Sequence, residues 1–315
     1  MDLNRILLIR TGALGDFIVT LPVLSAFKAA APRARIHLLG HPKTLALAGD
    51  YAHSIAGIEQ ADWAPFFVPN GRLSPRFADP LKTTDLVLSY LPDPDATFTA
   101  NLQRAGARTV LSFPPHPPPD GSVHVVDHLL RPLSDLHIPV ADPVPRVPLT
   151  REDHRQADRI LPHSEGAPPI VIHPGSGGAI KRWPAERFSA VADRLARRTG
   201  RPVVLLSGPA DGDLAGRIAS RMQTAPIRTP PLALRHLAAL LRRASVYLGN
   251  DSGPSHLAAA VGTPAVVLFG PTDPRIWAPR GEAVRILQGD PHLPPEHRLQ
   301  TISVNNVVEA LLGEF

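Results

Sequence analysis

Asp16 is the first residue of this chain whose type and setting could serve chemistry. It lies in the stretch IRTGALGDFIVTLP (residues 9–22), where Thr11, Gly12 and Gly15 lead from an apolar run into a helical pattern. A strand, a glycine turn and a helix in succession often bind a nucleotide phosphate at the helix N-terminus. Asp is also a favoured N-cap residue, and spacing alone favours a plain cap over a functional carboxylate.

The glycines of this turn do not match a nucleotide-phosphate loop. The dinucleotide fingerprint requires a third glycine and, about 20 residues further on, an acidic residue for the ribose. Residues 32–40 contain no Asp or Glu, and no Lys-Ser or Lys-Thr pair follows the turn. A carboxylate at the start of the helix would also compete with phosphate for the same N–H groups. The turn is therefore not predicted to bind phosphate.

A stronger anion-binding pattern opens the second half of the chain. In HPGSGGAIKRWP (residues 173–184), three glycines, a hydroxyl and a lysine stand between a strand and a helix. Glycines let backbone N–H groups approach an anion closely, and a lysine adds a point charge. The candidate residues are Gly175, Ser176, Gly177 and Lys181. A flexible loop with a surface lysine is the alternative interpretation.

A polar cluster follows a later strand in GNDSGPSHLAAAVGTP (residues 249–264). Asp251 and Ser252 come directly after the strand, and Gly253 opens a helix whose first turn contains His256. Ligands of open α/β sheets bind beyond the carboxyl ends of the strands, which is where this cluster falls. Plain helix caps are the alternative for the aspartate and the serine.

A third motif, FGPTDP (residues 269–274), places Thr272 and Asp273 just after another strand. Alone it indicates only a turn. Together the three motifs put glycine, hydroxyl and charged groups on one edge of the same sheet, which favours a nucleotide-diphosphate site over a metal site.

The elements that would position these residues alternate between strands and helices. The predicted strands cover residues 5–10, 35–40, 85–91, 107–113, 169–173, 202–208, 245–249 and 264–270. The predicted helices cover residues 17–31, 124–136, 184–200, 232–244, 254–262 and 303–315. Such alternation predicts α/β domains built on parallel sheets.

A proline-rich stretch, IPVADPVPRVPLT (residues 138–150), separates the two halves and is predicted to be a linker. We therefore expect two domains, residues 1–145 and 146–315, with a ligand cleft between them. Whether the closing helix packs back on the N-terminal domain is left open. The loop FPPHPPPDG (residues 113–121) must be irregular, because consecutive prolines cannot donate backbone hydrogen bonds.

The composition excludes several other classes of protein. The chain has 315 residues, is 43% hydrophobic and contains no cysteine, which rules out disulfides and thiolate metal sites. Its net charge of +5 comes entirely from residues 151–315, but no basic stripe with interleaved aromatic residues indicates nucleic-acid binding. His124 and His128 lack the zinc-protease pattern, and no Gly-x-Ser-x-Gly elbow is present. No apolar run is long enough to span a bilayer, which predicts a soluble protein.

Taken together, the motifs resemble glycosyltransferase family 9, the ADP-heptose:lipopolysaccharide heptosyltransferase family. The similarity rests on IRTGALGDFIVTLP, HPGSGGAIKRWP, GNDSGPSHLAAAVGTP and LFGPTDP, in that order and over most of the chain. It implies an α/β protein of the GT-B fold, in which two Rossmann-like domains with parallel sheets face an interdomain cleft. It also implies that the acceptor binds in the N-terminal domain and the nucleotide sugar in the C-terminal domain.

The resemblance also assigns roles to individual residues. It implies that Asp16 is the catalytic base, in a turn shaped by Thr11, Gly12 and Gly15, and that Lys181 is catalytic and contacts the nucleotide side of the donor. The other donor-binding residues would be Gly175, Ser176, Gly177, Asp251, Ser252, Gly253, His256, Thr272 and Asp273. Enzymes of this family invert the anomeric centre and need neither metal nor cofactor, the ADP-sugar being the donor substrate.

The resulting prediction is a cytoplasmic, metal-independent, inverting glycosyltransferase that moves a heptose from ADP-heptose to the lipopolysaccharide inner core. Its partners would be a nucleotide sugar and a glycolipid or oligosaccharide acceptor, with no nucleic acid. Peripheral contact with the cytoplasmic face of the inner membrane stays open. The alternatives are the same chemistry with another nucleotide sugar or another acceptor, a sugar-nucleotide epimerase, and a non-catalytic nucleotide-sugar binding module.

Overall fold

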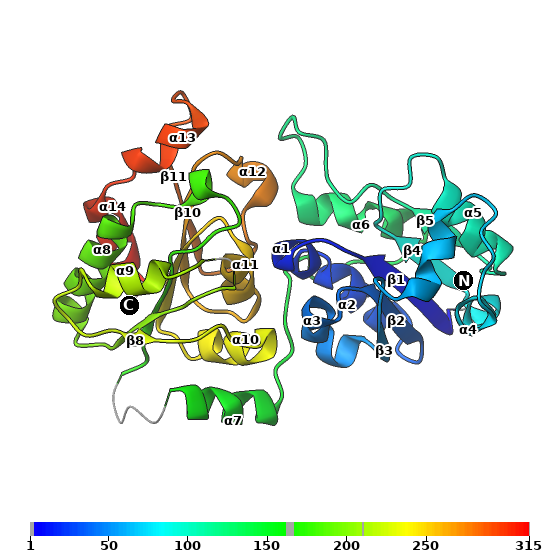
Figure 1. The fold of residues 1–315 in the computed structure, drawn as a ribbon, viewed down its shortest axis with the longest axis horizontal. Helices are drawn as coiled ribbons and strands as arrows, with labels where there is room; N and C mark the ends of the chain where they lie inside the picture. The colour runs from blue at the N-terminus through cyan, green and yellow to red at the C-terminus, as the bar shows by residue number, and fades with distance from the viewer. Residues whose placement is uncertain (1–2, 162–166, 210, 315) are drawn as a thin grey trace. The chain divides into compact units, whose positions relative to one another are not determined.

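The computed structural model describes residues 3–161, 167–209 and 211–314 (Figure 1). The chain divides into two compact units, Met1–Pro143 and Val144–Phe315. The division falls within the proline-rich stretch 138–150, which forms neither helix nor strand. Among the described residues, no helix is both long and apolar enough to cross a bilayer.

The first unit is built on a five-stranded parallel sheet. Its strands are β1 (Arg5–Arg10), β2 (Arg35–Gly40), β3 (Ser54–Gly57), β4 (Leu86–Ser89) and β5 (Val110–Ser112). They lie in the order β3-β2-β1-β4-β5, so the chain leaves β1 towards one edge and later adds β4 on the other side. The carboxyl ends of β1 and β4 therefore mark the switch point of this sheet, the usual ligand position in open α/β sheets.

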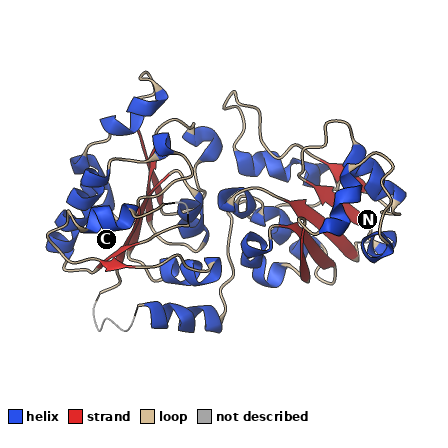
Figure 2. Cartoon of the chain, in the orientation of Figure 1, coloured by secondary structure: helices blue, strands red, loops and turns tan. Residues whose placement is uncertain are grey.

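Helices cover both faces of this first sheet (Figure 2). They are α1 (Leu14–Ile18), α2 (Leu21–Ala30), α3 (Pro42–Leu45), α4 (Pro75–Ala78), α5 (Thr97–Arg104) and α6 (Val125–Asp135), with 3₁₀ helices at Ala46–Tyr51, Ala61–Phe67 and Asp79–Thr83. The single helix predicted over residues 17–31 is wrong in detail, because the structure begins it at Leu14 and interrupts it before Leu21. Pro22 explains the interruption: it has no N–H to donate to the carbonyl of Ile18, and its ring crowds that carbonyl.

The second unit repeats the plan with a six-stranded parallel sheet. Its strands are β6 (Ile170–His173), β7 (Val203–Leu205), β8 (Ile227–Arg228), β9 (Val246–Asn250), β10 (Ala265–Phe269) and β11 (Val284–Gln288). The order is β11-β10-β9-β6-β7-β8, so the switch point lies at the carboxyl ends of β6 and β9. Strands of a parallel sheet covered on both faces are continuously apolar, and Ile170, Val171 and Ile172 of β6 are all fully buried.

The second sheet is also flanked by helices on both faces (Figure 2). They are α7 (Arg151–Ile160), α8 (Ala185–Thr199), α9 (Leu214–Ala219), α10 (Leu234–Arg242), α11 (Gly253–Ala260), α12 (Pro274–Trp277), α13 (Pro295–Arg298) and α14 (Val304–Leu312), with 3₁₀ helices at Ala179–Lys181 and Leu299–Thr301. The closing helix α14 packs inside this unit, against α8 and β10. Its buried side chains, Val307, Val308 and Leu311, join the same core as Val191 of α8.

Helix α7 was not among the elements predicted from the sequence. Thr150 and Asp153 form a capping box at its start: the Asp153 N–H donates to Thr150 Oγ1 (3.2 Å), and the Thr150 N–H donates to Asp153 Oδ2 (2.7 Å). Arg235 of α10 binds the same carboxylate and ties the two helices together. Burial raises the pKa of Asp153, but the hydrogen bonds from Arg235 and Thr150 outweigh burial and lower this pKa to about 2.

Candidate functional site

The switch point of the second sheet brings four of the predicted donor-binding residues together. The Lys181 ammonium donates to Asp251 Oδ2 at 2.7 Å, and the Thr272 hydroxyl donates to the same oxygen at 2.6 Å. The Ser176 hydroxyl donates to the backbone carbonyl of Asp251 at 3.2 Å. The aspartate side chain is 9% exposed and that of Lys181 32%, so the ammonium is the more accessible member of the pair. This is the arrangement expected where loops after adjacent parallel strands meet.

Asn250, the last residue of β9, fixes the glycine loop in place. Its side-chain amide donates to the carbonyl of Pro174 (2.8 Å) and accepts from the backbone N–H of Trp183 (3.1 Å), so it holds both ends of the loop. The asparagine is fully buried, where such hydrogen bonds are needed to offset desolvation. Sequence reasoning missed this residue, although the polar pair at Asn250 and Asp251 is itself a signal at the end of an apolar strand.

Position 175 must be glycine because a second buried carboxylate, that of Asp211, lies against its backbone. A Cβ on Gly175 would overlap the Oδ1 atom of Asp211, whereas a Cβ on Gly177 would meet no atom within 4 Å. The carboxylate lies 3.1 Å from His173 Nε2 and accepts the Gly208 N–H at 2.6 Å. The hydrogen bond from His173 lowers the pKa of Asp211. Sequence reasoning missed this pair; its signal is a histidine that ends a buried apolar strand.

The remaining residues predicted for this site lie at helix starts. Ser252 occupies the N-cap position of α11, but its side chain makes no capping hydrogen bond, so the plain-cap interpretation fails for it. Gly253 is the first residue of α11, and His256 lies in its first turn, buried at 7% exposure. Asp273 is not brought to the Asp251 cluster by any contact of the described residues; it caps α12 and binds Arg275, which lowers the pKa of Asp273.

A cavity of about 470 Å³ lies at the carboxyl ends of β7 and β8, on the same edge as the glycine loop. It is lined by Ser207, Gly208, Pro209, Gly212, Asp213, Arg228, Thr229, Pro230 and Pro231. Thr229 is buried, and within the described part of the chain its hydroxyl has no hydrogen-bond partner. A hydroxyl left unpaired beside a cavity is a polar group that a ligand could satisfy. Sequence reasoning did not find this cavity, because no motif marks it.

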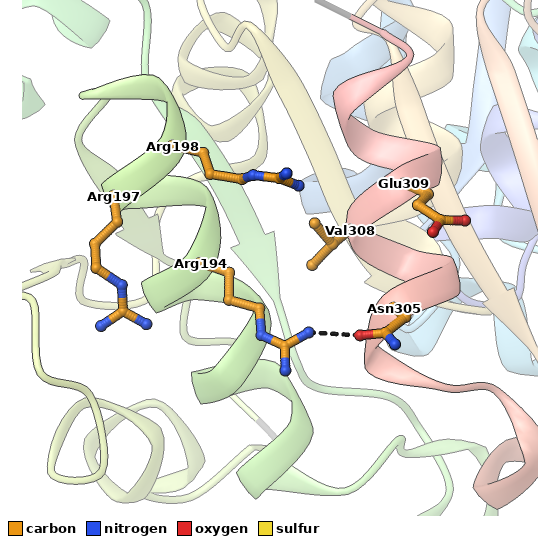
Figure 3. A pocket seen from close by; sticks show the side chains of 6 residues that line it. All are labelled: Arg194, Arg197, Arg198, Asn305, Val308 and Glu309. Carbon is orange, nitrogen blue, oxygen red and sulfur yellow. Dashed lines mark hydrogen bonds between the residues drawn. The ribbon is translucent and has the colours of Figure 1, made fainter.

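A second cavity, of about 320 Å³, lies between α8 and α14 (Figure 3). It is lined by Arg194, Arg197, Arg198, Asn305, Val308 and Glu309. Arg194 donates to Asn305 Oδ1 at 2.6 Å, as Figure 3 shows, and Arg197 donates to Gln223 Oε1 at 2.7 Å. Arginines in the last turns of a helix offset its dipole, which accounts for this cluster without a ligand.

The switch point of the first sheet presents Asp16. This residue is the third of α1, and its Oδ2 accepts the N–H of Ala13, the N-cap residue, at 2.8 Å. The interpretation of Asp16 as a plain N-cap is therefore wrong, because Ala13 occupies the N-cap position and Asp16 is the third helical residue. The Asp16 carboxylate nevertheless accepts the backbone N–H of that N-cap residue. Gly12 has φ +109°, and a Cβ there would lie 2.7 Å from Asp16 Oδ2, so only glycine lets the carboxylate fold over the turn. Thr11 precedes it, and Gly15 is the second residue of α1.

Two basic side chains face the other oxygen of Asp16. Arg10 Nη2 lies 3.4 Å from Oδ1. His116, in the proline-rich loop of residues 113–121, has its Nε2 3.9 Å from the same oxygen. The Asp16 side chain is 23% exposed and that of Arg10 only 2%. Burial lowers the pKa of Arg10 from its usual value, and the attraction of Asp16 opposes this shift. Sequence reasoning missed both basic residues as members of this site.

Two Rossmann-like units in one chain, each with polar side chains at its switch point, define the GT-B class of fold. A solved structure of a glycosyl transferase family 9 protein from Veillonella parvula shares it, with a TM-score of 0.83, 24% identity and coverage of 100% of this chain and 98% of that one. The family model of glycosyltransferase family 9 (heptosyltransferase) matches residues 105–305, and the chain belongs to this family of transferases.

Curated relatives carry heptosyltransferase names. Lipopolysaccharide heptosyltransferase 3 of Escherichia coli is 43% identical over 114 residues, covering 35% of this chain and only about a third (33%) of that protein. Lipopolysaccharide heptosyltransferase 1 of Pseudomonas aeruginosa is 28% identical over 299 residues, covering 86% of this chain and 79% of the relative. The solved structure of Escherichia coli heptosyltransferase WaaC with ADP has a TM-score of 0.72 at 20% identity, covering 99% and 100% of the two chains.

Proposed function

We propose that this protein is an inverting, metal-independent heptosyltransferase that moves a heptose from ADP-heptose to an acceptor in the lipopolysaccharide inner core. The observation that carries the proposal is the cluster in which Lys181 and Thr272 meet on the buried carboxylate of Asp251 beside a glycine loop. Two comparisons support ADP-heptose as the donor. A relative that matches 86% of this chain is named a lipopolysaccharide heptosyltransferase, and the WaaC structure was solved with ADP.

In this proposal the second unit binds the donor. Lys181 releases Asp251 and pairs with the diphosphate, while the N–H groups at the start of α11 add further donors. Asp251, still held by Thr272, is then free to accept a hydroxyl of the sugar. The nucleoside occupies the cavity beyond β7 and β8, where Thr229 Oγ1 gains a hydrogen-bond partner. Charge that develops on the leaving diphosphate is stabilised by the same cation and N–H groups.

The first unit supplies the base and binds the acceptor. An acceptor hydroxyl oxygen attacks the anomeric carbon from the face opposite the diphosphate, the bond from that carbon to the phosphate oxygen breaks, and ADP leaves with the electron pair. Oδ1 of Asp16 takes the hydroxyl proton, because Oδ2 accepts the close N–H of Ala13 (2.8 Å) whereas Oδ1 has only the longer contact with Arg10 (3.4 Å). Positioned proton transfer of this kind contributes about 10²–10⁴-fold to rate. The proposal requires the acceptor hydroxyl at Asp16 to reach the anomeric carbon of the bound donor, and exclusion of water from the reacting groups would prevent hydrolysis of the donor.

We place the reaction in the cytoplasm, with the lipid part of the acceptor bringing the protein to the cytoplasmic face of the inner membrane. No residue in this scheme holds a metal or a cofactor. Among the described residues, no three His, Asp or Glu side chains come together as a metal-binding group.

The test is an acceptor-dependent transfer assay with purified protein. ADP-, UDP- and GDP-linked sugars are each incubated with and without inner-core acceptors, and nucleotide release and glycosylated product are measured. We expect release of ADP only when acceptor is present, with an inverted anomeric centre in the product. Preference for UDP- or GDP-linked sugars would contradict the proposal that ADP-heptose is the donor. Donor binding without transfer to any acceptor would favour a binding module, and isomerised nucleotide sugar without acceptor would favour an epimerase.

A further inference from the structure

Arg10 is a buried charge that the proposed mechanism leaves unused. It is the last residue of β1 and ends directly at the switch point of the first sheet. Its side chain is 2% exposed, although desolvating a guanidinium is unfavourable unless its N–H groups are paired. A buried arginine at this place therefore needs a reason, and its contacts supply one.

The guanidinium of Arg10 binds the Asp16 turn at two points. Nε donates to the backbone carbonyl of Asp16 at 3.1 Å, and Nη2 lies 3.4 Å from its Oδ1. Oδ2 is separately held by the N–H of Ala13 at 2.8 Å. Each carboxylate oxygen thus has its own partner, and the rotation of the Asp16 side chain is restrained from both sides.

The same guanidinium also holds the proline-rich loop, residues 113–121. Nη1 of Arg10 donates to the carbonyl of Pro115 at 3.4 Å, and Nε2 of His128, on α6, lies 2.9 Å from the carbonyl of Pro114. Basic side chains from β1 and α6 therefore bind two consecutive carbonyls of the loop, those of Pro114 and Pro115. The next residue, His116, is the one that lies 3.9 Å from Asp16 Oδ1.

Only an arginine can make these contacts at once. Its planar fork presents donors in several fixed directions, whereas a lysine concentrates its charge at one point on a flexible stem. A lysine at position 10 would keep the charge beside Asp16 but could not bind the Asp16 carbonyl, the Asp16 carboxylate and the Pro115 carbonyl together.

We propose that Arg10 is a positioning residue, which sets the orientation of the Asp16 carboxylate and fixes the proline-rich loop beside it, so that the acceptor hydroxyl meets a preassembled base. This inference rests on the proposed function, because it assigns to Arg10 an effect that acts through Asp16. The acceptor, an alcohol of a sugar, then binds between the restrained carboxylate and the loop.

The test is a double-mutant cycle of Arg10→Lys and Asp16→Asn, read by steady-state transfer kinetics. We expect Arg10→Lys to lower kcat about 10²-fold, the scale of a misplaced catalytic group. Acceptor KM should change by less than about threefold because His128 still holds the loop at Pro114, and the Kd for ADP should change as little. In the Asp16→Asn background the same substitution should change kcat by less than about twofold, because coupled sites are not additive. Arg108→Lys is the matched control, since Arg108 pairs with Asp85 but is 73% exposed.

A merely structural role predicts different results. Equal fold losses in both backgrounds, or an Arg10→Lys kcat within threefold of the unmodified protein, would overturn the inference. Thermal unfolding reports whether each variant is folded, and ADP affinity reports whether the donor-binding unit is intact. Arg10→Gln, which is expected to behave as Arg10→Lys does, provides a second variant. If Asp16→Asn alone leaves kcat unchanged, the proposed base fails instead; if it abolishes transfer while Arg10→Lys does not, only the role of Arg10 fails.

Discussion

At the switch point of the first sheet a partly exposed carboxylate is held by a buried arginine, whereas at that of the second sheet a partly exposed lysine is held by a buried carboxylate. Arg10 and Asp16 are 2% and 23% exposed, and Lys181 and Asp251 are 32% and 9% exposed. In each pair the buried member orients the accessible one. In the proposed mechanism the same topological position presents a negative group to a substrate proton in the first unit and a positive group to a phosphate in the second, depending on which partner is buried.

The two switch points also use glycine in the same way. Gly12 and Gly175 each lie against a carboxylate, that of Asp16 and that of Asp211 respectively, so closely that a Cβ would collide with it. The two carboxylates differ in their exposure and in their partners. Asp16 is partly exposed beside its turn, whereas Asp211 is buried and paired with His173. The first glycine is expected to serve catalysis and the second the shape of a binding loop.

Gly12→Ala should give the largest effect on the first switch point. The substitution is strained at φ +109° and pushes on Asp16 Oδ2, so we expect transfer kcat to fall about 10²-fold. Calorimetry should find the Kd for ADP unchanged, because the donor residues lie in the other unit. Gly313→Ala is the control, since its nearest neighbour lies 3.6 Å from the added Cβ. An unchanged kcat would show that the turn tolerates a side chain and that Asp16 is not constrained by it.

Lys181→Met should give the next largest effect, on the second switch point. Loss of a charge-assisted contact to the diphosphate is expected to weaken ADP binding about 10- to 100-fold, measured by calorimetry. The acceptor KM should not change. Lys82→Met, which removes a lysine that pairs with Asp79 on the exposed surface, should leave ADP binding as it is. If the two variants bind ADP equally, Lys181 does not contact the donor.

Arg235→Met should lower the free energy of unfolding by about 1 kcal/mol at neutral pH, because Arg235 and Thr150 together lower the pKa of Asp153 to about 2 and the hydrogen bonds from Thr150 remain in the variant. A lowered folded-state pKa stabilises the protein above the usual aspartate pKa, and this contribution is lost as pH falls towards 2. The difference between the two proteins in urea unfolding should therefore be constant from pH 7 to about 5 and shrink below about pH 4. A difference that persists at low pH would mean that packing, rather than the ion pair, holds α7 on α10.

Chelation should give the smallest effect of all. If neither switch point uses a metal, EDTA should change transfer kcat by less than about twofold, and added Mg²⁺ or Mn²⁺ should not restore or raise it. A loss of activity in EDTA that a divalent ion reverses would mean that the diphosphate is neutralised by a cation and that Lys181 is not sufficient.

Much of this fold could be predicted from the sequence, because apolar strand runs and the order of motifs are local signals. The strand expected over residues 5–10 is confirmed, as is the α/β fold with two parallel sheets. Helix α7 and strand β11 (Val284–Gln288) were missed, because α7 is strongly polar and β11 is an edge strand in which no residue is fully buried. A capping box at Thr150 was the available signal for α7.

The candidate site could be predicted only in part. Lys181 and Asp251 follow strands that adjoin in the sheet, so the motif order was enough to suggest that they lie close together. Arg10 and Asn250 could not be found in this way, since their partners include backbone carbonyls, which carry no sequence identity. The catalytic and donor-binding roles themselves stay predictions.

The division of labour between the two switch points is tested most directly by one crossed measurement. ADP binding by calorimetry and acceptor-dependent transfer are measured on the unmodified protein, Asp16→Asn and Lys181→Met. We expect Asp16→Asn to bind ADP with unchanged affinity and to lose at least about 10²-fold in kcat, and Lys181→Met to lose affinity for ADP. Asp16→Asn with full turnover, or with ADP affinity reduced as much as in Lys181→Met, would contradict the account.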